Sequence, residues 1–168
     1  MQKDGITRLK RAYEDYLRRK KSAEYNHLME MGTQASSDGD FERSIRYYEE
    51  ALSFEPDSVE TLQARADSFR QGGQPRDAAE DYTRLIGQGF YHAYYFRALC
   101  YKKLLNWESV NADTQEAVKH SESVQAYELL TEAYKAMAAI SDQKRREIVT
   151  RGMSFCTAEQ GPQREPFD

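Results

Sequence analysis

The chain is 168 residues long, 39% hydrophobic and 31% charged, so it can form one domain with a substantial buried core. It contains no run of about 18 apolar residues, which argues against membrane insertion. Its net charge of −4 is uneven, because residues 1–24 carry eight Lys or Arg against four Asp or Glu, and the remainder carries sixteen against twenty-four. A basic lead segment therefore precedes an acidic body, and this acidic balance disfavours nucleic acid as the partner.

Residues 7–36 predict a long helical segment, since they contain no proline and only one glycine, Gly32. Apolar residues near helical spacing form a face on it, here called the N-terminal stripe: Ile6, Leu9, Tyr13, Tyr16 and Leu17. The stripe either packs on the helices that follow or docks onto another chain. The basic run at 18–21 indicates a nuclear-import signal, a phosphate contact or, more simply, a solvated helix face.

Turn and capping residues divide the next part of the chain into pairs of helices. Asp40 is placed to cap one helix and Ser58 to cap the next, while Pro56 ends the helix between them. Pro75 follows a turn that contains two glycines and takes the first position of another helix.

A third helix pair is predicted over 91–105 and 107–120, separated by a turn around Asn106. Ser123 is placed to cap the first helix of a fourth pair, and Ser141 to cap its second helix. These signals predict helices throughout the chain and no strand.

The same residue classes recur in these segments, which start at Tyr25, Val59 and Tyr91 and, in a weaker copy, near Val124. Small and large residues at shared spacings carry the recurrence: Leu28, Gly32, Ala35, Phe41, Tyr48, Ala51 and Pro56, then Leu62, Ala66, Phe69, Ala78 and Tyr82, then Tyr94, Ala98, Tyr101, Trp107 and Ala117. A small residue in the first helix lets its partner helix approach closely.

This pattern resembles the tetratricopeptide repeat, whose unit of about 34 residues reads W-x2-L-G-x2-Y, then A-x3-F, then Ala and Pro. The resemblance implies an all-α helical repeat solenoid with about three clear helix pairs and a degenerate fourth. The implied organisation is a basic N-terminal helix at 1–24, the repeat domain at 25–157 and a tail at 158–168, which has two prolines and is expected to be disordered. The alternative is an ordinary helical bundle. Three copies of the same residue pattern in the same order disfavour it.

Tetratricopeptide proteins mostly hold a peptide or a helix of another protein in a concave groove lined by the first helix of each pair. For this chain, the resemblance implies a groove with these residues: Met29, Thr33, Gln63, Asp67, Arg70, His92, Tyr95, Phe96, Leu99, Lys102, Glu128 and Glu132. Carboxylates beside aromatic and thioether groups suit a ligand with apolar anchors and some basic charge, although a solvated helix face fits the charged positions almost as well. Tyr95 and Phe96 are the candidate exposed anchors, and Phe96 equally suits packing against the adjacent pair.

One tetratricopeptide subgroup grips the C-terminal carboxylate of heat-shock proteins with a clamp of Lys, Asn, Asn, Lys and Arg. The matching positions in this chain carry none of those side chains: Met29, Thr33, Ala64, His92 and Phe96. Only His92 can add positive charge, and only when it is protonated, so chaperone tails are disfavoured as partners. A one-residue shift of the alignment makes Arg97 a candidate but does not restore the clamp.

The sequence shows no catalytic or metal-binding motif. His27, His92 and His120 lack metal-ligand spacing, and no nucleophile elbow, phosphate-binding glycine loop or HExxH motif occurs. We therefore expect a non-catalytic adaptor, without metal or cofactor, that binds another protein through the groove or the N-terminal stripe. Self-association through the stripe, as a structural subunit of a larger assembly, is the main alternative, and RNA binding or enzymatic activity ranks below it.

Cellular location is indicated by the cysteines and the N-terminus. Cys100 and Cys156 lack the close spacing of a zinc or redox site, which favours a reduced compartment where both are buried small hydrophobes. The first residues contain no apolar run of signal-peptide length. We expect a cytoplasmic protein, with the nucleus as the alternative location.

Overall fold

The computed structural model describes residues 2–121 and 123–158, with side chains described at 11–121, 123–144, 146 and 147. All regular structure in these ranges is α-helical, which confirms the predicted all-α class. The helices follow in this order: α1 (Gln2–Ser37), α2 (Phe41–Phe54), α3 (Val59–Gln71), α4 (Pro75–Gly87), α5 (Ala93–Lys103), α6 (Trp107–His120) and α7 (Val124–Ala158).

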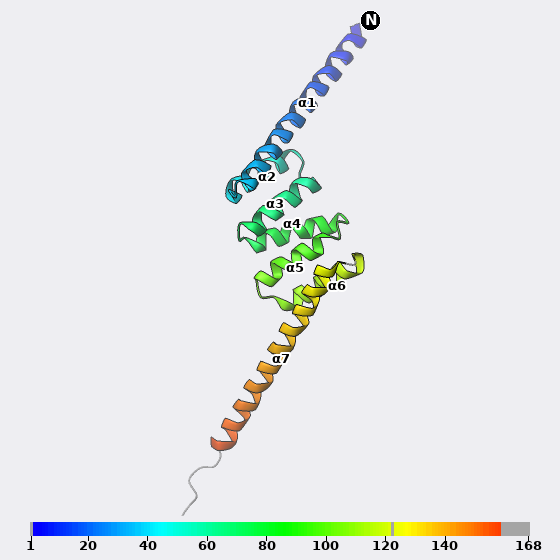
Figure 1. Ribbon diagram of the computed structural model, residues 1–168. Helices are drawn as coiled ribbons and strands as arrows, with labels where there is room; N and C mark the ends of the chain where they lie inside the picture. The colour runs from blue at the N-terminus through cyan, green and yellow to red at the C-terminus, as the bar shows by residue number, and fades with distance from the viewer. Residues whose placement is uncertain (1, 122, 159–168) are drawn as a thin grey trace, which may run out of the picture.

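The helices stack into one elongated array in which each helix packs on the next (Figure 1). α1 pairs with α2, α3 with α4 and α5 with α6, while the first part of α7 covers α6. α1 and α7 extend beyond the array from its opposite ends (Figure 1). No described helix combines the length and apolar composition that a bilayer crossing requires.

Small residues allow the helices of each pair to approach, as the recurrence predicts. A Cβ atom added to Gly32 would lie 2.5 Å from Cε1 of Tyr48, a buried residue of α2. Ala66 and Ala98, at the matching positions of α3 and α5, are completely buried. Close packing of this kind leaves no room for a larger side chain.

The predicted caps Asp40 and Ser58 begin their helices as expected, and Asn106 of the predicted turn caps α6 in the same way. The hydroxyl of Ser123, also predicted as a cap, instead donates to Gln125 Oε1 at 2.7 Å. The backbone N–H three residues further on donates to Asp40 Oδ1 at 3.0 Å, to Ser58 Oγ at 3.3 Å and to Asn106 Oδ1 at 3.2 Å. Pro75 takes the first position of α4, where its missing N–H leaves no bond unmade. These local signals therefore set the helix starts that position the groove.

The prediction of a capped final helix beginning after Ser141 is wrong. α7 is continuous from Val124 to Ala158, and Ser141 is an exposed residue within it. The sequence over 124–151 has no glycine or proline and is rich in good helix formers, so one serine does not interrupt it. The fourth unit therefore consists of one long helix, and the expected tail beyond Ala158 lies outside the described residues.

The N-terminal segment is also one continuous helix. α1 runs without a break from the basic residues into the first helix of the first pair, as the absence of proline predicts. Tyr13, Tyr16 and Leu17 of the N-terminal stripe are exposed along the part that projects from the array. The side chains of Ile6 and Leu9 lie outside those described.

The turn between α5 and α6 contains a strained residue. Leu105 has a φ of 57° and is 73% exposed, so it adopts a left-handed conformation without compensating burial. We expect Leu105→Gly to raise the free energy of unfolding by about 1 kcal/mol, because glycine removes that strain. Urea denaturation checks this, with Leu105→Ala as the control, since alanine keeps the Cβ atom and should give no gain.

Candidate functional site

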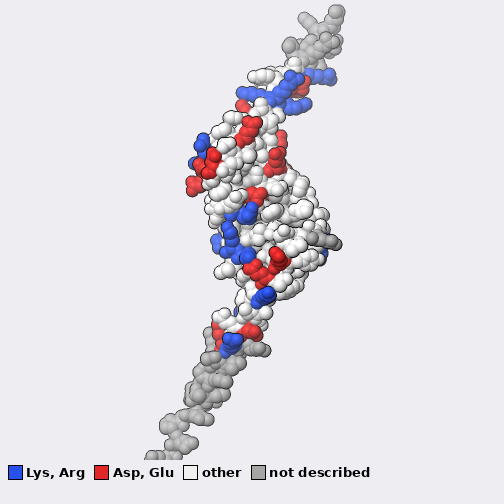
Figure 2. Space-filling model, viewed as in Figure 1, with Lys and Arg blue, Asp and Glu red and all other residues white. Residues whose placement is uncertain are grey.

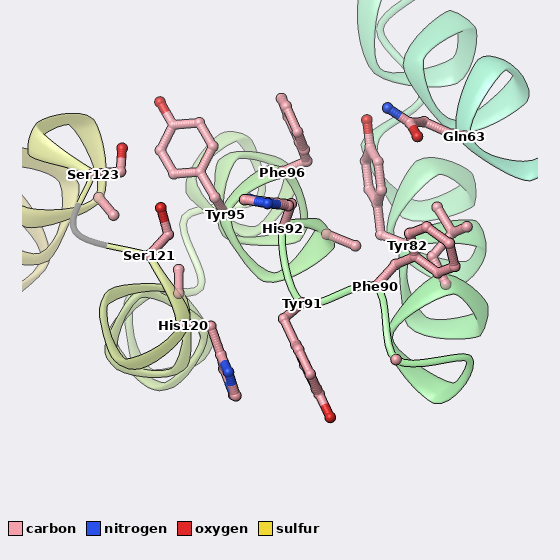
Figure 3. Close-up of a pocket in the computed structure, with 15 residues that line it drawn as sticks. Gln63, Tyr82, Phe90, Tyr91, His92, Tyr95, Phe96, His120, Ser121 and Ser123 are labelled. Atoms are coloured by element: carbon pink, nitrogen blue, oxygen red, sulfur yellow. The ribbon is translucent and has the colours of Figure 1, made fainter. Parts of the chain in front are cut away.

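A pocket of about 680 Å³ opens between the second pair, the third pair and the start of α7. Gln63 of α3 and Tyr82 of α4 line one side, Tyr95 and Phe96 of α5 line the middle, and His120 of α6 lies at the opposite edge (Figure 3). The remaining lining residues come from these helices and the turns between them: Leu85, Gly89, Phe90, Tyr91, His92, Ala93, Ala117, Ser121, Ser123 and Ala126.

Aromatic rings form much of the pocket wall. Phe96 stacks on Tyr82 with ring centroids 5.7 Å apart, and Tyr95 meets Phe96 edge-on at 5.5 Å. Tyr91 and His120 stack face to face at 3.9 Å. Aromatic walls supply a large apolar surface in fixed orientation, which suits capture of an apolar side chain.

A hydrogen-bonded group of three residues supports the wall from behind. Tyr82 Oη donates to Asp67 Oδ1 at 2.7 Å, and Arg70 Nη2 donates to the same oxygen at 3.0 Å. Burial and the bond to Asp67 raise the pKa of Tyr82 well above its ordinary value, so the hydroxyl remains protonated at neutral pH. The Arg70 guanidinium also lies 5.7 Å from the centroid of the Phe96 ring. Asp67 and Arg70 are therefore engaged with each other and with the wall.

Four of the twelve predicted groove residues line this pocket: Gln63, His92, Tyr95 and Phe96. Lys102 and Glu132 instead join α5 to α7 by an ion pair of 2.6 Å. Leu99 packs against the buried cluster of Ala98, Val110, Leu129 and Ala133 between the third pair and α7. Glu128 is exposed on α7.

Met29 and Thr33 lie in α1, at the far end of the array from the pocket. Met29 Sδ accepts a hydrogen bond from Thr61 at 3.2 Å, and the Thr33 hydroxyl donates to the Met29 carbonyl at 2.8 Å. Neither residue lines the pocket. The groove prediction thus spans a longer surface than the pocket does.

Several pocket residues are absent from the groove that the sequence predicts, among them Tyr82, Phe90, Tyr91 and His120. The helix predicted over 91–105 includes Tyr91, but α5 begins at Ala93 and the preceding residues form a turn. The run from Phe90 to Phe96 is rich in aromatic residues, and this was the available signal. Turn geometry decides which of these rings face the pocket.

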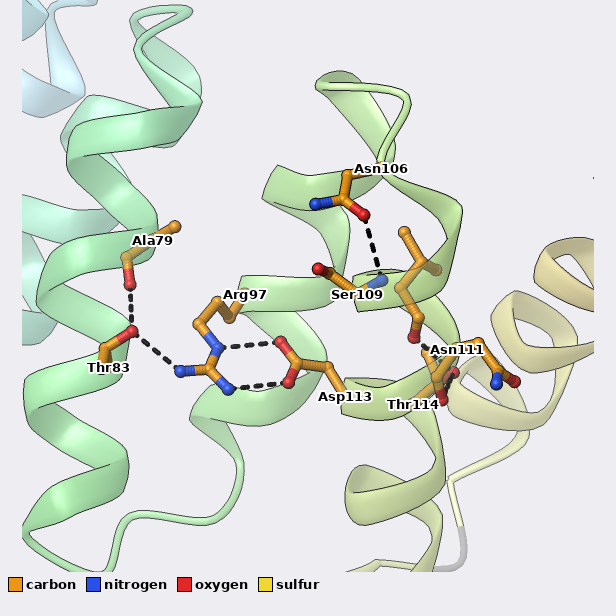
Figure 4. A network of polar contacts seen from close by, with 9 residues as sticks. Ala79, Thr83, Arg97, Asn106, Ser109, Asn111, Asp113 and Thr114 are labelled. Carbon is orange, nitrogen blue, oxygen red and sulfur yellow. Dashed lines mark hydrogen bonds and ion pairs between the residues drawn. The ribbon is translucent and has the colours of Figure 1, made fainter. Parts of the chain in front are cut away.

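Two buried ion pairs repeat at the same places in the second and third pairs. Arg65 binds Asp81 through two hydrogen bonds of 2.8 and 2.7 Å, and Arg97 binds Asp113 through two bonds of the same lengths (Figure 4). Arg97 also donates to the Thr83 hydroxyl at 2.8 Å, which links the third pair to the second. These bonds hold the Arg97 side chain against α6 and α4. Arg97 does not line the pocket.

Charge on the surface is mixed over the array, while basic side chains gather on the described part of α1 (Figure 2). None of the lining residues of the pocket is Lys, Arg, Asp or Glu. Among the described residues, no group of three or more His, Cys, Asp or Glu side chains is placed to hold a metal ion. The pocket is therefore an apolar site with a few neutral polar groups.

No protein-family model and no curated protein matches this chain. Solved structures do: the first TPR domain of Spaghetti (RPAP3), bound to an HSP90 peptide, superposes with a TM-score of 0.64 at 18% identity, covering 70% of this chain and 95% of that one. The fold is that of the tetratricopeptide repeat. This likeness confirms the helical repeat solenoid and, at this identity, carries no more than the fold.

Other tetratricopeptide structures agree. The Sgt2 TPR domain from Aspergillus fumigatus has a TM-score of 0.58 at 19% identity and covers 86% of this chain and 89% of its own. A tetratricopeptide repeat protein from Parabacteroides merdae has a TM-score of 0.63 at 25% identity, and the present chain spans 48% of its length. The second TPR domain of human RPAP3, at 16% identity, is in complex with an HSP70 peptide.

Proposed function

We propose that this chain is a non-catalytic adaptor that binds a short linear peptide or helix of another protein. The observation that carries this proposal is the aromatic pocket of about 680 Å³ between the second pair, the third pair and the start of α7. Its size suits one or two large apolar side chains, and its lining holds no formally charged residue. Peptide binding by other tetratricopeptide domains, such as that of Spaghetti with an HSP90 peptide, supports the same class of partner.

Polar groups also line the pocket beside the aromatic rings. The Tyr95 hydroxyl, the His92 ring and the Ser123 hydroxyl belong to the lining and can bond to the backbone of an extended peptide (Figure 3). An apolar anchor would remove water from the rings, while these groups satisfy the peptide bonds beside it. The exposed Glu128 of α7, a predicted groove residue outside the pocket lining, would favour a basic residue elsewhere in the same ligand.

Selection of linear peptides from a random displayed library, followed by calorimetry on the purified chain, tests this proposal. The selected peptides should share an aromatic or large aliphatic residue. Tyr95→Ala should weaken their binding at least about tenfold, because an aromatic side chain that becomes fully desolvated dominates binding energy. The control is Tyr47→Ala, a half-buried tyrosine of α2 outside the pocket, which should leave the affinity unchanged. Equal affinity for the wild type and the Tyr95 variant would contradict groove recognition.

Comparing the affinity of a peptide that has a free C-terminal carboxylate with that of its amide gives a second test. The positions that match the carboxylate clamp are Met29, Thr33, Ala64, His92 and Phe96. Since these offer at most one cationic donor, we expect a peptide with a free C-terminal carboxylate to bind no better than its amide. A strong preference for the free carboxylate would instead assign this chain to the clamp subgroup.

We further propose that the adaptor acts in the cytoplasm or nucleus, with residues 25–157 as the binding unit. Cys100 supports a reducing compartment, because it is a completely buried free thiol. Burial raises the pKa of its thiol to about 11, so it contributes packing and no reactive thiolate at neutral pH.

A further inference from the structure

In every pair of the array, three positions of the first helix face the second helix. They carry Leu28, Gly32 and Ala35 in α1, Leu62, Ala66 and Phe69 in α3, and Tyr94, Ala98 and Tyr101 in α5, all of them buried or half-buried. The clash between a Gly32 Cβ atom and Tyr48 shows how closely the second helix lies on this face. In each of the three pairs, the second helix therefore covers this face of the first helix.

The same three positions of α7 carry Tyr127, Thr131 and Tyr134, here called the open face. All three are exposed, with Tyr127 at 50% and Tyr134 at 52%. Within the part of the chain that the structure describes, no second helix covers them, because α7 continues to Ala158 where a turn would have been needed. The Gln115 amide donates to the Tyr134 hydroxyl at 3.1 Å, so the open face meets α6 at this point.

The opposite end of the array shows what a solvated terminal face looks like in this chain. There the outward positions of α1 are His27, Glu30 and Gln34, which are polar and exposed. Their equivalents on the helices inside the array are buried or half-buried: Thr61, Ala64 and Ser68, then Ala93, Phe96 and Cys100, then Ala126, Leu129 and Ala133. One end is therefore closed by polar residues, while the other presents two tyrosines. The amino-acid composition of the open face therefore resembles that of the contacts between helices inside the array.

A helix of suitable length and chemistry exists in the chain itself. The second helices α2, α4 and α6 have 13 or 14 residues. The projecting part of α1 over 2–24 is longer than that, and its N-terminal stripe exposes Tyr13 at 63% and Tyr16 at 59%. The described part of one molecule thus exposes two apolar faces.

Charge also favours bringing these two faces together. Residues 1–24 carry eight positive and four negative side chains, a net charge of +4, whereas the remaining residues carry sixteen and twenty-four, a net charge of −8. Directly beside the three residues of the open face in the sequence are Glu128, Glu132 and Lys135, all of them exposed. The basic segment of one copy is therefore attracted to the acidic body of another copy as a whole.

We propose that the open face of α7 is covered by the N-terminal stripe of a second copy of this chain. α1 of the second copy takes the place of the missing second helix of the fourth unit. The two faces of one molecule cannot meet each other, because α1 and α7 leave the array at opposite ends (Figure 1). The contact must therefore form between molecules, as a reciprocal dimer or as a head-to-tail chain.

Two double variants of the full chain test this pairing by light scattering coupled to size exclusion. Tyr13→Glu with Tyr16→Glu charges the stripe, and Tyr127→Glu with Tyr134→Glu charges the open face. The wild type should have a mass at least twice the 19.5 kDa of one chain, and each double variant alone should fall to 19.5 kDa. Mixing the two variants should restore a 1:1 complex, because the open-face variant retains an unchanged stripe and the stripe variant retains an unchanged open face.

The control variant is Leu105→Glu, which charges an exposed apolar residue of the α5–α6 turn that belongs to neither face and should leave the mass unchanged. Circular dichroism of each variant should match the wild type, since all the substituted tyrosines are exposed. Raising the salt concentration should weaken the association.

Each other outcome overturns the proposal in a distinct way. A wild type that stays at 19.5 kDa at all concentrations shows that this chain does not self-associate. A stripe variant that alone keeps the wild-type mass indicates that α7 pairs with α7, and an open-face variant that keeps it indicates that α1 pairs with α1. Two monomeric variants that do not combine when mixed exclude the pairing of stripe with open face.

Discussion

Replacing Asp113 with alanine is expected to lower the free energy of unfolding by about 3 kcal/mol. The Asp113 side chain is only 7% exposed and neutralises the Arg97 guanidinium, whose side chain is 16% exposed. Its removal leaves a largely buried cation with the Thr83 hydroxyl as its other side-chain acceptor. Urea denaturation followed by circular dichroism measures the loss.

Two comparisons show whether the buried charge causes that loss. Glu116→Ala breaks an exposed ion pair with Lys119 on the same helix and should cost well under about 1 kcal/mol. Arg97→Met combined with Asp113→Leu removes both charges and should recover part of the stability lost by Asp113→Ala alone. A cost for Asp113→Ala no larger than that of Glu116→Ala would show that the pair contributes little.

The Gly32→Val substitution is expected to destabilise the chain by about 2 to 3 kcal/mol, because it forces extra volume into a close-packed contact. Three atoms of the Tyr48 ring lie within 2.9 Å of the site that a Cβ atom would occupy. The ring is buried at 2% exposure, so it can move only by disturbing the α1–α2 contact. The measurement is again the free energy of unfolding in urea.

A double-mutant cycle with Tyr48→Leu isolates this contact. Once the ring is removed, Gly32→Val should cost much less than it does in the wild type. Gly87→Val is the matched control, since a Cβ atom at Gly87 would have no neighbour within 4 Å. Equal costs for Gly32→Val with and without the Tyr48 ring would refute the steric explanation.

The buried Arg–Asp pairs illustrate a limit of prediction from sequence. Arg65 and Asp81 are sixteen residues apart, as are Arg97 and Asp113, and the two pairs are 32 residues apart. These spacings match the repeat, but charged residues are common on solvated helix faces, and the letters alone do not distinguish a buried pair. Only the packing of α5 on α6 shows that the carboxylate is desolvated.

The pocket was predicted in part for a related reason. First-helix positions are regular in the sequence, so Gln63, Tyr95 and Phe96 could be assigned to the groove before the fold was known. Residues from turns and second helices, such as Phe90, Tyr91 and His120, join the pocket through the path of the chain between α4 and α5 and between α6 and α7. That path depends on how the pairs stack and has no periodic signature.

The sequence by itself determined the helices, most of their ends and the repeat, because capping, helix-breaking residues and close helix contacts depend on short-range chemistry at regular spacing. Tertiary structure alone decided that α7 is one unbroken helix whose tyrosines remain uncovered, and which aromatic rings meet in the pocket. Whether a face is covered depends on another element arriving there. The type and spacing of a residue do not predict whether another helix packs on it. The burial of side chains, the shape of the pocket and the exposure of the open face could therefore be known only from the folded chain.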